Sequence, residues 1–230
     1  MRKQFLLIVG MACTLGMASG ATFINENFEG ATSTFGTPQT AAGVIAGSAF
    51  SLISGSIDIN GPGTASGAYG QLCRAPASSK CIDTTGGGQR SRGVFESTSG
   101  FTFLMNVQYA LSFSLVRWDD TDASNPGAAG LQDTKIQVTL GGIGGLVDNS
   151  YTTDSTWINK TVTVLFIPSS TVLGAKLRFT DLGVAASTSY AGAIVDNVVL
   201  GDTSSIPEPA TFAFVGLGVA ALAATRRKRA

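Results

Sequence analysis

The chemistry open to this chain is limited by the absence of histidine from its 230 residues. Without imidazole, Ser-His-Asp and Cys-His mechanisms are excluded, as are metal sites that depend on histidine ligands. Carboxylate chemistry, or a mechanism based on Lys or Tyr, remains. Glu29, Glu96, Asp119 and Asp181 are candidates for a glycosidase-type carboxylate pair, but no spacing in the sequence brings two of them together. We expect a non-enzymatic protein, with a small carboxylate-dependent hydrolase as an alternative.

Asp196 lies in the apolar segment 194–200, in the same alternation phase as Ile194, Val198 and Leu200. If that face belongs to the core, the carboxylate needs a partner, because an unpaired buried charge is very costly. Calcium takes several oxygen ligands and would supply that partner. The alternative is a carboxylate that accepts backbone hydrogen bonds at the end of a strand.

The segment 25–30, with the sequence NENFEG, opens the body of the chain, and the segment around Asp196 closes it. This arrangement resembles jelly-roll carbohydrate-binding modules and related galactose-binding-like domains, in which the first and last strands pair and share a calcium ion. The resemblance implies that Glu29 and Asp196 are carboxylate ligands of a structural calcium. It also implies an extracellular polysaccharide as the ligand of the body.

Two other groups of residues are candidates for binding. Asp120, Asp122 and Ser124 have the alternate spacing of a calcium loop, but the Gly and the closing Glu of an EF-hand are missing, so we expect a solvated acidic turn. Three aromatic residues, Trp118, Trp157 and Tyr151, are candidates for stacking on sugar rings. The alternative for each Trp is a place in the core.

The body of the chain contains two cysteines, Cys73 and Cys81, since Cys13 lies in the N-terminal apolar segment. An even number of cysteines in an exported domain favours a disulfide. The residues between them are polar, so the sequence predicts a bridge that staples a surface loop. Two free thiols are the alternative, since a zinc site would have too few ligands.

The elements that must position these residues are strands. Period-two alternation recurs in several segments, and turns rich in Gly and Ser separate them. Alternation covers 50–59, 101–115, 136–140, 162–166 and 177–179. The segment 194–200 is apolar on both faces, as expected for a central strand that is covered on two sides. About eight or nine such strands predict an all-β fold, a two-sheet antiparallel sandwich of jelly-roll type.

The C-terminal segment has three parts in a fixed order. Pro207, Glu208 and Pro209 are followed by the uncharged apolar run 210–225 and then by the basic residues Arg226, Arg227, Lys228 and Arg229. The apolar run is near the lower limit for a helix that spans a bilayer. The basic residues should stay on the cytoplasmic side.

This order resembles the PEP-CTERM sorting signal of Gram-negative bacteria, which exosortase-type enzymes process. The resemblance covers the tail, 203–230, and implies export through the inner membrane to the cell surface or extracellular matrix. It also implies transient membrane engagement and removal of the tail. The alternative is a permanent single-span anchor.

The N-terminus agrees with export. Arg2 and Lys3 precede an apolar segment that ends in small residues at 18–20, which predicts a signal peptide, 1–20, cut by signal peptidase. The body, 21–202, then carries nine Lys and Arg against fourteen Asp and Glu, a net charge of −5. An acidic domain without a basic cluster excludes nucleic acid as an expected partner. The expected role is binding or organising polysaccharide, with a structural or adhesive matrix protein as the alternative.

Overall fold

The computed structural model describes residues 21–32, 39–61, 73, 80–85, 91–116, 118–120, 130–132, 134–153, 159–183 and 192–203. Within the compact unit Ala21–Thr203, every regular element among these residues is a β-strand. The expected all-β fold of two antiparallel sheets is confirmed. The predicted signal peptide, 1–20, and tail residues 204–230 lie outside the described residues. In the described part of the chain, no helix is long and apolar enough to cross a bilayer.

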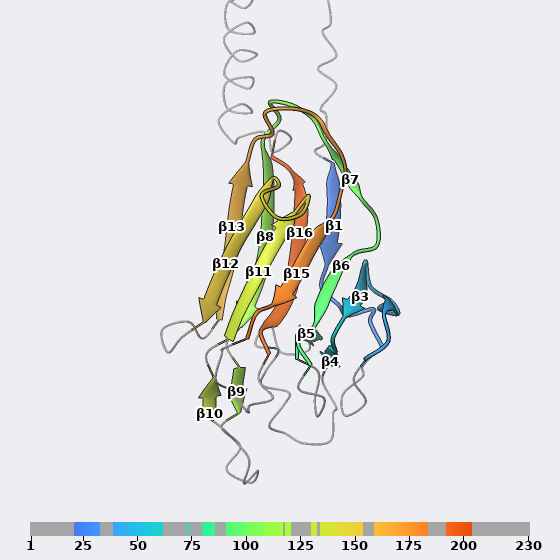
Figure 1. Ribbon diagram of the computed structural model, residues 1–230, viewed down its shortest axis with the longest axis vertical. Helices are drawn as coiled ribbons and strands as arrows, with labels where there is room; N and C mark the ends of the chain where they lie inside the picture. Colours follow the sequence, from blue (N-terminus) through green and yellow to red (C-terminus); the bar gives the residue numbers. More distant parts are fainter. Residues whose placement is uncertain are drawn as a thin grey trace, which may run out of the picture. The chain divides into compact units, whose positions relative to one another are not determined.

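The two sheets of the sandwich pack face to face (Figure 1). The first sheet has the order β13-β8-β16-β5-β4, and β1 pairs with β16. Its strands are β1 (Thr22–Glu26), β4 (Asp58–Asn60), β5 (Cys81–Asp83), β8 (Tyr109–Val116), β13 (Asn159–Phe166) and β16 (Ile194–Asp202). β16 is therefore the central strand, as its apolar residues on both faces predict.

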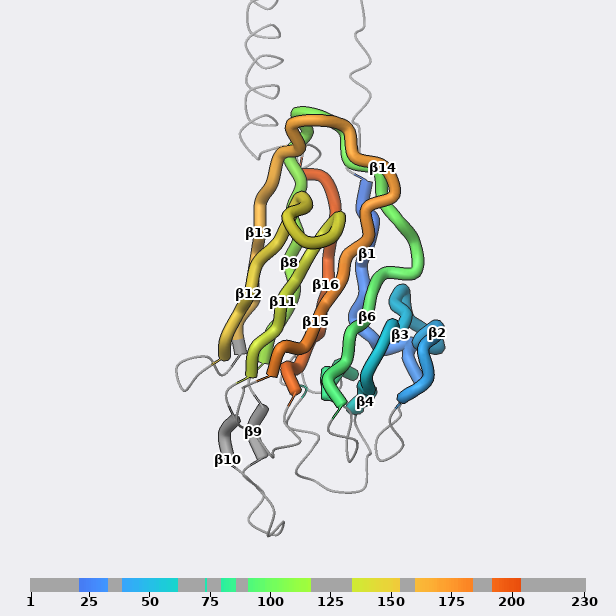
Figure 2. Tube along the Cα trace, viewed as in Figure 1, coloured from blue at the N-terminus to red at the C-terminus, as the bar shows by residue number. Residues whose placement is uncertain are grey.

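The second sheet has the order β12-β11-β15-β6-β3-β2. Its strands are β2 (Gly43–Val44), β3 (Phe50–Ser54), β6 (Val94–Ser97), β11 (Thr134–Leu140), β12 (Val147–Thr153) and β15 (Leu177–Asp181). Two short ladders complete the fold: β7 (Phe101–Phe103) with β14 (Val172–Ala175), and β9 (Trp118–Asp120) with β10 (Gly130–Gln132). The tube in Figure 2 shows both ends of the described unit, β1 and β16, reaching the same end of the sandwich.

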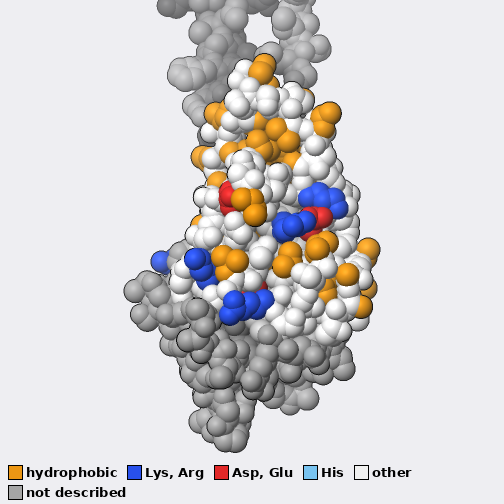
Figure 3. Space-filling model, in the orientation of Figure 1, with side chains coloured by type: hydrophobic (Ala, Val, Ile, Leu, Met, Phe, Trp, Pro, Cys, Tyr) orange, Lys and Arg blue, Asp and Glu red, His pale blue; other side chains and the backbone are white. Residues whose placement is uncertain are grey.

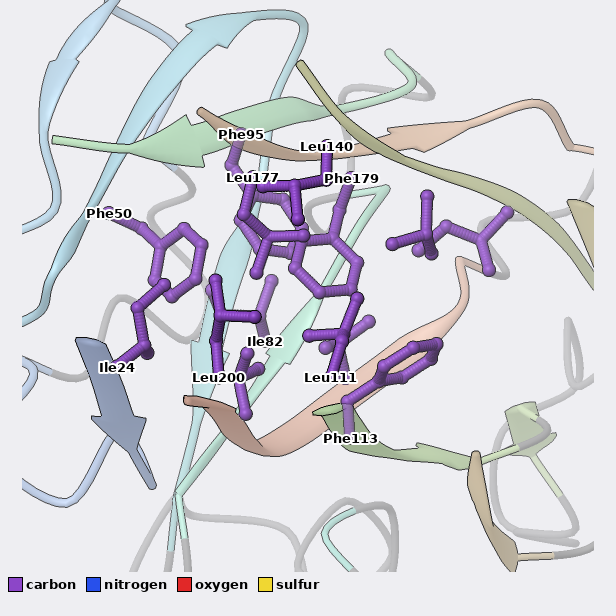
Figure 4. Close-up of a cluster of buried hydrophobic side chains, with 14 of the residues drawn as sticks. Ile24, Phe50, Ile82, Phe95, Leu111, Phe113, Leu140, Leu177, Phe179 and Leu200 are labelled. Carbon is purple, nitrogen blue, oxygen red and sulfur yellow. The ribbon is translucent and has the colours of Figure 1, made fainter. Parts of the chain in front are cut away.

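Aromatic rings hold the two sheets together. Phe179 of β15 stacks on Phe95 of β6, with ring centroids 4.9 Å apart, and meets Phe113 of β8 edge to face at 5.4 Å. Figure 4 shows these rings among aliphatic side chains from both sheets, including Ile82 and Leu111. Such ring pairs add to the stabilisation that burial of their apolar area provides. Most of the alternating apolar residues read from the sequence thus form the core, whereas Met105 in the segment 101–115 is exposed.

The sequence predicts fewer strands than the sixteen that the described residues contain. The longer strands, such as β8 and β11, were found from their alternation. Strands of two to four residues, such as β2 and β5, are too short to show a period. Their strand conformation depends on pairing with a longer neighbour, which the local sequence does not reveal.

The predicted disulfide is present, with Cys73 Sγ and Cys81 Sγ 2.00 Å apart. Both half-cystines are buried, and they pack with Val116 and Ile194 in a small cluster. The bridge itself is therefore not at the surface, because Cys81 is the first residue of β5, which lies between β16 and β4.

Replacing Cys73 and Cys81 together with Ser should lower the free energy of unfolding by about 2–3 kcal/mol, because the closed loop is short. Denaturant unfolding of the oxidised protein and the double variant measures the change. Reduction of the wild-type protein should produce a loss of similar size. An unfolding curve that does not respond to reductant would contradict a structural role for the bridge.

Candidate functional site

Asp196 is buried in β16 at the centre of the first sheet, with 1% of its surface exposed. Its Oδ1 accepts a hydrogen bond from the backbone N–H of Asn197 at 2.6 Å, and its Oδ2 accepts one from Asn197 Nδ2 at 3.2 Å. Asn197 has φ of 50°, in the left-handed region, and the register with β8 shifts between Asp196 and Val199. A β-bulge therefore provides the local hydrogen bonds of this buried carboxylate.

Glu29 is tied to Lys80, on the segment that leads into β5. Glu29 Oε1 accepts a hydrogen bond from the Lys80 backbone N–H at 2.8 Å. The Lys80 Nζ donates to the backbone carbonyls of Glu29 at 2.9 Å and Ala31 at 2.6 Å. Two carbonyl oxygens of the segment after β1 thus converge on one cation, the lysine ammonium.

Glu26, the last residue of β1, is a third carboxylate of this region. Its Oε1 accepts a hydrogen bond from the Phe28 N–H and its Oε2 from the Ala49 N–H, both at 2.7 Å. Glu26 is not among the residues that the sequence pattern predicts for this site. The signal was available, because Glu26 shares its alternation phase with the buried Ile24 of the same strand.

The environment of Asp196 favours its neutral form. Burial chiefly, together with the negative charges of Glu29 and Glu26, raises the pKa of Asp196 to about 6, against the lowering effect of the hydrogen bond from Asn197. The structure therefore brings Glu29 and Asp196 within electrostatic range of each other, as the predicted pair requires. A bound cation would relieve the repulsion among these three carboxylates.

Metal binding at this place stays a prediction. Among the described residues, no three Asp, Glu or Cys side chains gather closely enough to hold a metal ion. A calcium ion between Glu29 and Asp196 would therefore need backbone carbonyls or water for its other oxygen ligands. The second calcium candidate from the sequence is the acidic turn of Asp120, Asp122 and Ser124. Asp120 lies in β9, whereas Asp122 and Ser124 lie outside the described residues.

A second group of acidic residues links the two sheets near β5. Asp181 Oδ2, at the end of β15, accepts hydrogen bonds from Thr84 Oγ1 at 2.7 Å and Thr85 Oγ1 at 3.1 Å. Asp83 is paired in register with Asp58, and its Oδ1 accepts the Thr85 N–H at 3.0 Å. Burial raises the pKa of Asp83 well above its ordinary value, with further contributions from the charges of Asp58 and Asp181.

Glu96 and Asp181 do not form the carboxylate pair of a hydrolase. Glu96 alternates with the buried Phe95 on β6 and is paired in register with Arg178, on the outer face of the second sheet. Asp181 is three residues from Arg178 on β15, so its side chain is on the opposite face. The sheet itself therefore separates these two carboxyl groups.

Glu96 lies instead in a groove of about 470 Å³ on the outer face of the second sheet. The lining of the groove combines polar side chains, glycines and apolar residues: Glu96, Thr139, Gly141, Gly142, Val172, Leu173, Gly174, Ala175, Lys176 and Arg178. Figure 3 shows blue and red side chains next to each other on this face. The volume falls within the range of small-ligand sites.

The Glu96 carboxylate is held by two cationic side chains. Arg178 donates from Nε at 2.9 Å and from its terminal nitrogen at 2.5 Å to Oε2, and Lys176 Nζ is 3.0 Å from Oε1. Burial alone would raise the pKa of Glu96, but the hydrogen bonds and positive charges of Arg178 and Lys176 hold it below the ordinary value. The group is therefore an ionised, rigid set of donors and acceptors at neutral pH.

The ion pair is part of a row of polar side chains that crosses five strands. In register, Asp148 of β12 faces Thr139, Thr139 faces Arg178, Arg178 faces Glu96, and Glu96 faces Ser51 of β3. Four spacings between neighbouring strands give the row a length of about 19 Å. No sequence pattern predicts this row, because its members are far apart in the chain and each alone looks like a solvated strand residue.

Of the three aromatic residues proposed for ligand binding, Tyr151 has a side chain within the described part of the structure. The Tyr151 ring on β12 packs edge to face against the core residue Phe113, with centroids 5.7 Å apart. Burial raises the pKa of its hydroxyl. Only the backbone of Trp118 is described, in β9, and Trp157 lies outside the described residues. A sugar-stacking role for these residues stays a prediction.

Comparison with known proteins identifies the end of the chain. Residues 205–228 match the family of the PEP-CTERM protein-sorting motif. The tail is a PEP-CTERM sorting signal. It contains Pro207, Glu208 and Pro209 and the basic residues 226–228, as the sequence predicts. A PEP-CTERM tail indicates export and cell-surface sorting in Gram-negative bacteria and implies processing by an exosortase.

The body that precedes the PEP-CTERM tail is similar to several solved β-structures. An apo cyclase from Fischerella sp. has a TM-score of 0.48 and 17% identity, covering 82% of this chain and 99% of that chain. The C-terminal family 22 carbohydrate-binding module of Clostridium thermocellum Xyn10B has a TM-score of 0.35 and 14% identity, covering 81% and 96%. At these scores the similarities carry no argument about ligand or activity. A search of curated proteins finds no significant match.

The ionisation of Asp196 provides a test of the carboxylate group. Its pKa is raised from 3.8 to about 6 in the folded protein. Between about pH 4 and pH 6 the carboxyl group is therefore still protonated in the native state but already ionised in the unfolded chain. The charged carboxyl thus destabilises the fold increasingly as pH rises through this window. In chelator, Asp196→Asn should raise the free energy of unfolding by about 1–3 kcal/mol above pH 6 and change it little below pH 4.

If Glu29 and Asp196 share a calcium ion, millimolar calcium should raise the melting temperature of the wild-type protein, because the ion binds the folded state. Asp196→Asn should lose that response. Asp148→Asn, a change at an exposed carboxylate, should keep it. Identical wild-type melting curves in chelator and in calcium would remove calcium from this part of the molecule.

Proposed function

We propose that this protein is a non-enzymatic component of the cell surface or extracellular matrix that binds extracellular polysaccharide in the groove of the second sheet. The row from Asp148 to Ser51, with the Glu96–Arg178 pair at its centre, is the observation that carries the proposal. A polysaccharide presents many hydroxyl groups, each of which can donate and accept hydrogen bonds. Ionised side chains form the stronger hydrogen bonds with such groups.

The glycines and the anchored loop of the groove favour ligand binding there. Gly141, Gly142 and Gly174 line it without side chains, which leaves backbone groups accessible beside the ion pair. Asp148 anchors the loop that carries the first two glycines, because its Oδ2 accepts the Gly144 N–H at 2.8 Å and its Oδ1 accepts Gln137 Nε2 at 2.7 Å. The groove is thus preformed, which lowers the entropic cost of binding.

The location favours the same ligand class. A PEP-CTERM tail directs the protein to the cell surface, where polysaccharide is an available polymer. A catalytic role has less support, since Glu96 and Asp181 lie on opposite faces of one sheet. If the protein binds no polysaccharide in the test below, a structural or adhesive role without a sugar site is favoured instead.

Binding of the purified protein to a panel of polysaccharides tests the proposal. Glu96→Gln should weaken binding about tenfold or more, because it removes a charge that orients Arg178 and accepts ligand hydrogen bonds, an effect of about 1.5–3 kcal/mol. Thr139→Val tests the groove floor without changing charge. Lys160→Gln, on β13 of the other sheet, is the matched control.

The melting temperatures of these variants must be compared, since Glu96 also joins β6 to β15. Saturable binding that Glu96→Gln and Thr139→Val leave unchanged would place the sugar site elsewhere. Absence of binding to any polysaccharide, with the fold intact, would overturn the proposal in favour of a structural role.

Processing of the tail is a separate prediction. The mature surface protein should lack the PEP-CTERM tail, and replacement of Pro207, Glu208 and Pro209 with Ala should leave an unprocessed, membrane-associated chain. Intact-mass measurement of surface-extracted protein distinguishes these forms. A mature mass that includes residues through Ala230 would show a permanent anchor instead.

A further inference from the structure

Exposed apolar side chains gather in two loops at one end of the sandwich. The connection from β7 to β8, residues 104–108, carries Leu104 and Met105, which are 54% and 53% exposed. The connection from β13 to β14, residues 167–171, carries Ile167, which is 60% exposed. Neither loop contains a charged residue. We call these three residues the apolar tip.

The two loops are joined into one rigid surface. The Asn106 N–H donates to the Pro168 carbonyl at 3.0 Å, and the Met105 N–H donates to Thr171 Oγ1 at 3.4 Å. The Leu104 N–H donates to the Tyr109 hydroxyl at 2.8 Å. Figure 1 shows both loops crossing the upper end of the sandwich, and Figure 3 shows orange side chains gathered toward that end.

The last described residues of the body, Asp202 and Thr203, contact the start of β8 and the loop that connects β7 to it. The Thr203 N–H donates to the Gln108 carbonyl at 3.0 Å, and Thr203 Oγ1 lies 3.0 Å from Gln108 Oε1. The residue before it, Asp202, is in register with Tyr109. The last described residue of the body is thus hydrogen-bonded to the loop that carries Leu104 and Met105.

Few residues separate this point from the apolar run of the sorting tail, which begins at Ala210. A fully extended chain spans at most about 3.3–3.6 Å per residue, so Thr203, which is bonded to the loop of the tip, stays within about 25 Å of the start of that run. Whenever the run is inserted in a membrane, the lipid surface is therefore the partner that the chain holds beside the tip. A short tether raises the effective concentration to the millimolar range, so even a weak contact is populated.

We propose that the apolar tip docks on the surface of the lipid bilayer while the PEP-CTERM tail is inserted. Leu104, Met105 and Ile167 enter the interfacial region, and their uncharged loops keep ionised groups out of it. The contact orients the body before the tail is removed. Processing of the tail ends the tethering and releases the tip, because the remaining contact is too small to hold the protein alone.

The test uses the full chain in vesicles of pure phosphatidylcholine, with Cys13→Ser so that one introduced cysteine is labelled. A fluorophore at Leu104→Cys should be quenched by lipids that carry a shallow nitroxide. The same fluorophore at Val44→Cys, which is 65% exposed in β2 at the edge of the second sheet, should not be quenched. A label at Ile167→Cys gives a second, independent reading should Leu104→Cys fail to fold.

Leu104→Ser combined with Met105→Ser should reduce quenching of the Ile167 label to the level of the Val44 control while tail insertion is unchanged. Equal quenching of the tip and control labels would overturn the proposal. A second result would also overturn the proposal: the tip label is not quenched, yet the variant with Leu104→Ser and Met105→Ser shows slower tail processing in cells. The partner of the tip would then be the membrane-embedded sorting enzyme. These readings are independent of polysaccharide binding, since none of the substituted residues lines the groove.

Discussion

The pairing of β16 with three neighbours is the interaction on which the rest of the molecule depends. This last strand pairs with β8 along almost its whole length. On its other edge it pairs with β5 through residues 194–195 and with β1 through residues 198–201. Because β1 pairs with β16, the first and last segments of the body lie together. Asp196 becomes a buried carboxylate near Glu26 and Glu29, and both ends of the body emerge at one end of the sandwich.

The same alternation that builds the core also builds the groove. On β6 and β15, Phe95 and Phe179 stack between the sheets, whereas Glu96 and Arg178 pair on the outer face. The aromatic stack keeps the two strands in a single register. That register places the carboxylate opposite the guanidinium, so the geometry of the ion pair depends on the packing of the core.

Buried carboxyl groups at two places in the fold lower its free energy of unfolding when they are ionised. Asp83 and Asp196 both have raised pKa values, for which burial is the main cause. Threonine hydroxyls and backbone N–H groups near Asp83 and Asp181, and Asn197 beside Asp196, supply hydrogen bonds that offset part of the desolvation. Such networks favour one arrangement of strands over others, because a shifted register would leave these oxygens without donors.

The sequence alone determined features that depend on neighbouring residues. Alternation located the long strands and their core faces, the two body cysteines indicated the disulfide, and the order of residues at the C-terminus identified the sorting signal. The alternation also placed Asp196 in phase with core residues, and its side chain is buried.

Only the tertiary structure decided the short strands, the position of Glu26 and Lys80, and the row through Glu96 and Arg178. These features join residues that are tens of positions apart in the chain, and each residue by itself has the composition of an ordinary exposed strand or turn. Local sequence records which face of a strand is apolar, but strand order and register decide which polar residues meet on the other face.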